Sequence, residues 1–118
     1  MLAISGASAM ETSTNNFANA PAVVSVDIST FCKAVMQGDV ETVTKLIQLG
    51  ENVNQKSLGM APIHYAARYN KVEVLKTLIE NGADLKAKCD KGYTAVKYAE
   101  LSNAKEALAV LESALQAD

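Results

Sequence analysis

The residues in this sequence best suited to chemistry are a single histidine and two cysteines. An imidazole beside a thiol forms the base and nucleophile of a cysteine-dependent enzyme, and the same side chains are common zinc ligands. His64 is the only histidine, and neither Cys32 nor Cys89 stands at metal-ligand spacing from it. The sequence therefore predicts no metal site, and a Cys32–His64 pair is the one catalytic arrangement left to test against the fold.

The carboxylates and glycines offer no clearer chemistry. Glu73, Glu80, Glu100 and Glu106 fall on expected helix surfaces or ends, where acidic groups favour solvation and helix-end electrostatics. The glycines are spread along the chain instead of forming a phosphate-binding loop. These observations predict a chain that is not an enzyme, binds no cofactor and takes no small-molecule substrate.

The composition argues against two further classes of partner. The 118 residues carry a net charge of −2, and Arg68 is the only arginine among 11 basic residues, so we expect no nucleic acid partner. No apolar stretch approaches the roughly 18 residues that a membrane-spanning helix needs. The two cysteines are expected in different structural units and therefore unpaired, which favours a reducing compartment.

The elements that must position these groups are indicated by an internal period of about 33 residues. Three sets of residues share this register: Ala34, Ala66 and Ala99; Leu46, Leu78 and Leu111; and Gly38, Asn70 and Asn103. Within each copy, apolar residues follow the spacing of two helix faces separated by a tight turn. The period therefore predicts three stacked helix pairs.

The copies share residues that begin and end helices as well as their apolar spacing. In the first copy, Asp27 or Ser25 is expected to cap a helix through Val35, and a second helix is expected to stop at Gly50. In the second copy, Pro62 is expected in the first helical turn and Asn70 in a left-handed turn. The third copy is expected to bury five residues: Val96, Ala99, Leu108, Leu111 and Leu115.

Two connections join the copies, over residues 50–59 and 82–92. Each has a glycine near its far end and an apolar residue that we expect to be a buried anchor, Val53 in the first and Leu85 in the second. Since the first connection is one residue shorter, the two tips are predicted to differ in shape.

At this point the chain resembles the ankyrin repeat family, whose repeat runs Gly-x-Thr-Pro-Leu-His-x-Ala-Ala and ends in Gly-Ala-Asp-Val-Asn. The central copy matches at Gly59, Pro62, His64, Ala66, Ala67, Gly82, Ala83 and Asp84. The third copy matches at Gly92, Thr94 and Ala99, and the first at Gly38, Gly50, Val53 and Asn54. The resemblance implies an all-α solenoid of stacked antiparallel helix pairs joined by β-hairpin-like loops.

The resemblance also gives the lone histidine a structural role. It implies that the His64 imidazole bonds the backbone of the adjoining hairpin. Cys32 occupies the equivalent position one repeat earlier, so the two side chains are expected about 8–10 Å apart, too far for a catalytic pair.

Departures from the family pattern mark the outer copies as capping repeats. In the central copy, Ala61 replaces the family threonine. In the third copy, Ala95 and Lys97 replace the family proline and histidine. The first copy lacks the whole Thr-Pro-Leu-His sequence. Terminal repeats pack on one neighbour only, so such changes are expected there. We therefore predict an N-terminal capping repeat at 28–57, a central repeat at 58–88 and a C-terminal capping repeat at 89–118, which together form a complete array.

Residues 1–27 differ in composition from the rest of the chain. They are rich in Ala, Ser, Thr and Asn, which predicts a flexible tail. An alternative is a truncated export signal, because Leu2-Ala3-Ile4 precedes an Ala-x-Ala sequence at Ala7 and Ala9. The compartment therefore stays open between the cytoplasm and export to the periplasm or outside the cell.

The repeat register also selects a candidate binding surface. On the family's concave side, the inner helices and hairpin tips carry eight candidate partner-binding residues: Met36, Leu58, Met60, Arg68, Tyr69, Lys91, Tyr93 and Leu101. Exposed apolar and tyrosine side chains in one patch indicate a protein interface. Two alternatives need no partner: burial against the neighbouring hairpin, and residues 10–27 folding back through Phe17, Val23 and Val24.

The sequence therefore favours a non-catalytic protein–protein interaction module with one unidentified protein partner, as a monomer or weak homodimer. A self-associating structural protein and a regulatory subunit of a separately encoded enzyme are the alternatives.

Overall fold

The protein is described by a computed structural model that covers residues 27–117 and contains six helices in that range. They are α1 (Thr30–Gln37), α2 (Val40–Gln48), α3 (Pro62–Arg68), α4 (Val72–Glu80), α5 (Ala95–Leu101) and α6 (Lys105–Ala117). The expectations for residues 1–26, a tail or a truncated export signal, lie outside the described residues.

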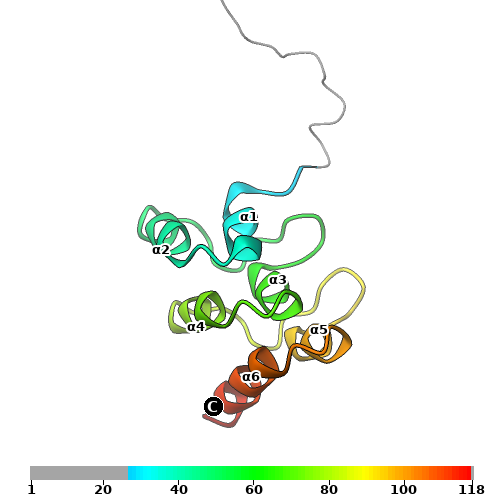
Figure 1. Cartoon of the computed structure of the whole chain (residues 1–118). Helices are drawn as coiled ribbons and strands as arrows, with labels where there is room; N and C mark the ends of the chain where they lie inside the picture. Colours follow the sequence, from blue (N-terminus) through cyan, green and yellow to red (C-terminus); the bar gives the residue numbers. More distant parts are fainter. Residues whose placement is uncertain (1–26, 118) are drawn as a thin grey trace, which may run out of the picture.

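The helices form three antiparallel pairs stacked along one direction (Figure 1). The inner helix α3 packs against α1 and α5, and the outer helix α4 packs against α2 and α6. The two connections between pairs project on the same side, next to the inner helices (Figure 1). The predicted all-α array of helix pairs joined by hairpin-like loops is therefore confirmed.

Local sequence signals set most of the helix ends. Pro62 lies in the first turn of α3, and Gly50 follows α2 with a φ of 104°, both as predicted. The prediction of Asp27 or Ser25 as the cap of α1 was wrong. Ser29 caps this helix, because its side chain accepts a hydrogen bond from the Cys32 N–H at 3.1 Å and closes the first turn.

The core runs between the two helix layers and is made of aliphatic residues and small alanines. Its fully buried large members include Ile63, Leu75, Leu78 and Leu111. Alanines at the contacts of α1, α3 and α5 let these helices approach closely, with Ala66 and Ala99 both fully buried. The periodic residues in both helix layers therefore form one continuous hydrophobic cluster.

Five residues expected to be buried are only half-buried. Val53 and Leu85 lie in the two connections, which project beside the stack (Figure 1). Val96, Leu108 and Leu115 lie in the third pair, which has a packing neighbour on one side among the described residues. These positions follow the repeat pattern but lack the second layer that would cover them.

The two hairpin tips differ as their lengths predicted. Ser57 and Met60 form an antiparallel bridge across a two-residue tip, in which Leu58 and Gly59 both have positive φ, of 54° and 85°. This is the pattern of a type I′ turn. In the second tip the Gly92 N–H donates to the Cys89 carbonyl at 2.8 Å, which gives a longer tip closed by a glycine at positive φ.

An asparagine in the central repeat caps a helix in the next repeat. The Asn70 side-chain oxygen accepts a hydrogen bond from the Ala107 N–H at 2.9 Å, and its Nδ2 donates to Glu106 Oε1 at 3.0 Å. The bond from Asn70 lowers the pKa of the Glu106 carboxyl below its ordinary value. Asn70 therefore supplies an N-terminal cap for α6 from outside that helix.

We expect Asn70→Ala to lower the free energy of unfolding by about 1 kcal/mol more than Asn103→Ala does. Both residues have left-handed backbones, with φ of 57° and 56°, so both alanine variants incur the same backbone strain. Only Asn70 donates to and accepts from another helix among the described residues. Urea unfolding of the two variants measures the difference, and equal losses would show that the cap contributes nothing.

None of the helices within residues 27–117 is both long enough and apolar enough to cross a bilayer.

Candidate functional site

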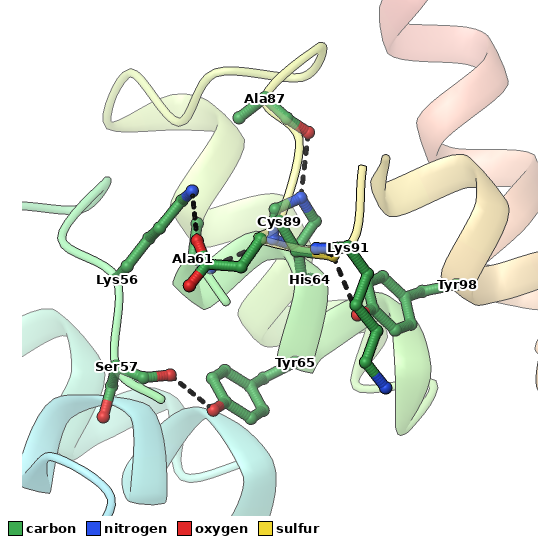
Figure 2. Close-up of polar contacts among 10 residues, drawn as sticks. Lys56, Ser57, Ala61, His64, Tyr65, Ala87, Cys89, Lys91 and Tyr98 are labelled. Carbon is green, nitrogen blue, oxygen red and sulfur yellow. Dashed lines mark hydrogen bonds and ion pairs between the residues drawn. The ribbon is translucent and has the colours of Figure 1, made fainter. Parts of the chain in front are cut away.

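The lone histidine is fully buried and bound at both ring nitrogens. The Ala61 N–H donates to His64 Nδ1 at 3.0 Å, and Nε2 lies 2.9 Å from the Ala87 carbonyl of the second connection (Figure 2). The neutral ring with its proton on Nε2 satisfies both bonds. Neither ring nitrogen therefore remains for Cys32. His64 therefore positions a hairpin, as the resemblance implied.

Burial lowers the pKa of His64, an effect only partly offset by the Ala87 carbonyl. Lys56 lowers it further, and Asp84 raises it. The imidazole is therefore held in its neutral form, which is the form that the Ala61 bond requires.

Both cysteines are buried and free. Burial raises the pKa of the Cys32 thiol, with a small opposing effect from Ser29. Burial also raises the pKa of Cys89, but hydrogen bonds from Tyr98 and from the backbone of the second tip outweigh it and lower that pKa below its ordinary value. The Cys89 sulfur accepts from the Tyr98 hydroxyl at 3.1 Å and from the Lys91 N–H at 3.3 Å (Figure 2).

The Cys89 sulfur therefore organises the second hairpin tip and holds Tyr98 in place. Burial, reinforced by the bond to Cys89, raises the pKa of Tyr98 to about 12, so Tyr98 stays a neutral donor. The Tyr98 ring lies between His64, at 5.5 Å, and Tyr93, at 5.6 Å, measured between ring centroids. This aromatic row connects the buried histidine to the open side of the second tip.

A groove opens in front of this row, between the hairpin tips and the inner helices. Its first half is an open cleft of about 440 Å³ lined by side chains from both tips, α3 and α5. Six of the eight predicted binding residues line it: Leu58, Met60, Arg68, Lys91, Tyr93 and Leu101. Cys89 and Tyr98 form part of the same wall.

A second half, of about 540 Å³, continues the groove toward the start of the described chain. It is lined by the remaining two predicted residues, Met36 and Tyr69, together with Asp27, Ile28 and Tyr65. Leu58, Met60 and Arg68 line both halves. We call the two halves together the concave groove; the fold brings all eight predicted residues to it.

The exposure of the groove residues is uneven. Leu58, Tyr69, Tyr93 and Leu101 are 57%, 40%, 36% and 59% exposed, and they are four of the five exposed large hydrophobic residues among those described. Met60 differs from the expectation of an exposed anchor, because it is only 9% exposed and packs in the core cluster. Met60 forms the bridge with Ser57 just before α3 begins, and its side chain forms the floor of the groove.

Leu58 is exposed on a backbone that does not suit leucine. Its φ of 54° is left-handed, a conformation that costs a residue with a β-carbon about 1–2 kcal/mol. Asparagine, aspartate or glycine is the usual choice at this position of a type I′ turn. Strain combined with an exposed apolar side chain is a feature of functional sites.

The hairpin tips that carry these residues are fixed to each other and to the helices. Lys56 Nζ lies 3.1 Å from Asp90 Oδ1, and the Asp90 N–H donates to the Gly59 carbonyl at 2.9 Å. A β-carbon at Gly59 would lie 2.9 Å from an Asp90 carboxylate oxygen, and the φ of 85° at Gly59 also favours glycine. The Tyr65 hydroxyl donates to the Ser57 carbonyl at 2.6 Å and attaches the first tip to α3 (Figure 2).

Sequence reasoning missed several residues that line the groove. Asp27 and Ile28 line its second half, and Cys89 and Tyr98 its first. The contact between Cys89 and Tyr98 depends on how the second tip folds back on α5. No residue pattern within one repeat predicts that contact.

This structure is a helical repeat protein of the solenoid class. Its helix pairs stack on one another, its hairpins project from one side, and a buried histidine joins a hairpin to a helix. The family profile described as "Ankyrin repeats (3 copies)" matches residues 31–118, and the chain belongs to the ankyrin repeat family. Ankyrin repeats are generally protein-binding modules.

One curated relative is the mouse 2-5A-dependent ribonuclease, which is 35% identical to this chain over 60 residues. The match covers 49% of this chain and 8% of the ribonuclease. The chain therefore matches only a small part of that protein's length.

Proposed function

We propose that this chain is a non-catalytic protein-binding module that holds one partner protein in the concave groove. The observation that carries the proposal is the gathering of four exposed large hydrophobic residues on one face: Leu58, Tyr69, Tyr93 and Leu101. Apolar side chains collected on one face of a soluble protein are typical of interaction surfaces, and tyrosines are frequent anchors.

The rigidity of the groove supports the proposal. The two tips are joined by the Lys56–Asp90 ion pair and by a backbone hydrogen bond, and His64 and Tyr65 attach them to α3. A surface that is ordered before it binds loses less conformational entropy on association. The array therefore acts as a scaffold that displays a fixed set of side chains.

The chemistry of the candidate residues supports a binding role over catalysis. Both His64 nitrogens are bonded to backbone groups, and the Cys89 sulfur is buried as a hydrogen-bond acceptor. The groove is open and accessible to water, whereas catalytic sites usually exclude it. On this proposal, any chemical reaction is catalysed by the partner and not by this chain.

The test is affinity capture from native cell extract with the wild-type chain and with a Leu58→Gly, Leu101→Ser double variant. We expect the variant to lose the captured partner by at least tenfold, since each exposed apolar anchor contributes about 1 kcal/mol or more to binding. The melting temperature should not fall, because both side chains are exposed and glycine relieves the left-handed strain at Leu58.

The matched control is Leu49→Ser, which removes the most exposed leucine of the described chain, at 81%, and lies outside the groove. This control should keep the partner. Capture that is equally strong with the double variant would overturn the assignment of the groove. A partner lost equally with Leu49→Ser would place the interface elsewhere.

A further inference from the structure

The single arginine of the sequence lies where the two halves of the concave groove meet. Arg68 is the last residue of α3, and its exposed side chain lines both halves. All other basic residues of the chain are lysines. Arginine differs from lysine because its planar, forked group binds a carboxylate through two parallel hydrogen bonds.

The charge on Arg68 is not neutralised within the described chain. Among residues 27–117 the ion pairs are Lys56–Asp90 and Lys76–Glu73, so Arg68 and Lys91 have no carboxylate within 4.0 Å there. Asp90, the acidic residue of the first half, already pairs with Lys56 at 3.1 Å. The first half of the groove therefore presents two cations without a matching anion.

The Arg68 guanidinium is also oriented in advance. Its central carbon lies 5.4 Å from the centroid of the Tyr69 ring, at cation–π distance. This contact restricts the Arg68 side chain, while no described carboxylate pairs with its N–H groups. Because the arginine side chain is already restricted, it loses less conformational entropy when it binds a carboxylate.

We propose that the concave groove recognises an extended peptide segment of the partner in which an acidic side chain stands between apolar residues. The acidic side chain binds Arg68 at the junction of the two halves. The apolar residues on either side of it contact Leu58 and Leu101 in one half, and Met36 and Tyr69 in the other. This inference rests on the proposed function and specifies the chemistry of the partner.

The position of Arg68 favours a carboxylate within a segment over a carboxylate at a chain end. Apolar lining continues on both sides of Arg68, with Leu101 on the α5 side and Met36 on the α1 side. A C-terminal carboxylate bound to Arg68 would leave one half empty. A segment that passes through the junction covers both halves.

The experiment is selection of a library of random peptides on the full-length chain, in parallel with the Arg68→Glu variant. With the wild type we expect enriched peptides to carry Asp or Glu flanked by apolar residues. With Arg68→Glu the acidic preference should vanish and lysine or arginine should replace it at the same place. A selected acidic peptide should bind about tenfold or more weakly to Arg68→Gln than to the wild type, because a hydrogen bond to a charged group is lost.

The outcomes separate this inference from the proposed function. Enriched peptides with no acidic preference, or a preference unchanged by Arg68→Glu, overturn the inference and leave the groove as a peptide-binding site. If the wild type enriches no peptide beyond background, the inference is overturned, and the proposed function depends on the capture experiment alone.

Two further measurements test whether the groove is instead occupied by the chain's own residues 10–26 or by a second copy of the chain. A synthetic peptide of residues 10–26 that displaces the selected peptides would show that the chain's own segment fits the groove and would overturn a separate partner. Sedimentation that shows a dimer broken by the selected peptide would assign the groove to a second copy, with the same consequence. A Lys97→Glu variant, altered on α5 outside the groove, should keep the wild-type peptide preference.

Discussion

Replacement of Leu75 by alanine is expected to lower the free energy of unfolding by about 2–5 kcal/mol. Leu75 lies on α4 and is fully buried, so the truncation leaves a cavity as well as removing apolar contacts. Because α4 packs against both α2 and α6, the loss weakens both interfaces of the central repeat. A small domain has only about 5–15 kcal/mol of stability in total, so the variant loses a large share.

The control for this prediction is Leu49→Ala, the same chemical change at a leucine that is 81% exposed just after α2. We expect its unfolding free energy to stay within about 0.5 kcal/mol of the wild type. Urea unfolding followed by circular dichroism measures both variants. Losses of similar size at the two positions would mean that Leu75 is not in the core.

The fold could be predicted from the sequence because the same physical requirement recurs in every copy. Each outer helix must bury one apolar stripe, so the positions of Leu46, Leu78 and Leu111 repeat with the helix pair. Each tight turn must pass through a left-handed residue, which glycine or asparagine supplies at Gly38, Asn70 and Asn103. These requirements are local, and they leave a periodic trace in the sequence.

The interactions between repeats leave no such trace. Asn70 appeared only as a turn residue, yet its side chain also caps a helix 37 residues further along the chain. The repeat register singled out neither Lys56 nor Asp90, which join the two hairpin tips across 34 residues. Such contacts depend on how far one repeat is displaced from the next, which the apolar pattern does not encode.

The candidate site shows the same limit. Repeat equivalence selected eight residues that lie on one face, and it treated Met60 and Tyr93 alike as candidate binding residues. Met60 follows a two-residue tip and is 9% exposed, whereas Tyr93 follows a longer tip and is 36% exposed. A difference of one residue in a tip changes the direction of the chain as it enters the helix, and with it which side chain faces the partner.

The outward face of the third pair also differs from that of the central pair. Lys97 and Glu100 are exposed on α5 at the register positions of His64 and Ala67, which are fully buried on α3. Two charged side chains on this face would have to lose their hydration if another helix pair packed on it. Among the described residues, α5 therefore carries charged side chains at the positions where α3 carries buried ones.

The second large effect is expected at His64, whose replacement by leucine should cost several kcal/mol of unfolding free energy. A leucine fills much of the space but bonds neither the Ala61 N–H nor the Ala87 carbonyl. Each buried group left unpaired costs about 1–3 kcal/mol. The loss should also loosen the second hairpin tip, so partner binding should weaken in parallel, unlike the selective loss expected from Leu58→Gly with Leu101→Ser.

The pH dependence of stability provides an independent measurement at the same residue. Because burial lowers the pKa of His64 in the folded protein, the unfolded chain takes up a proton below its ordinary pKa of 6.5 while the folded chain does not. Protonation of Nδ1 would also set two donors, the ring N–H and the Ala61 N–H, against each other. The contribution of His64 to stability should therefore be constant above pH 7 and fall as the pH drops below 6.5, by at most about 1.4 kcal/mol per pH unit.

The loss should level off below the folded-state pKa, where both states bind the proton. His64 is the only histidine, so the decrease just below pH 6.5 can be assigned to one side chain. Carboxylates with lowered pKa values, such as Asp39 and Glu106, act at more acidic pH, since their ordinary values are 3.8 and 4.5. Urea unfolding at a series of pH values should show the decrease in the wild type and not in His64→Leu. A slope that persists in the variant would assign the pH dependence to another group and would contradict a buried, neutral imidazole as the link between α3 and the second hairpin.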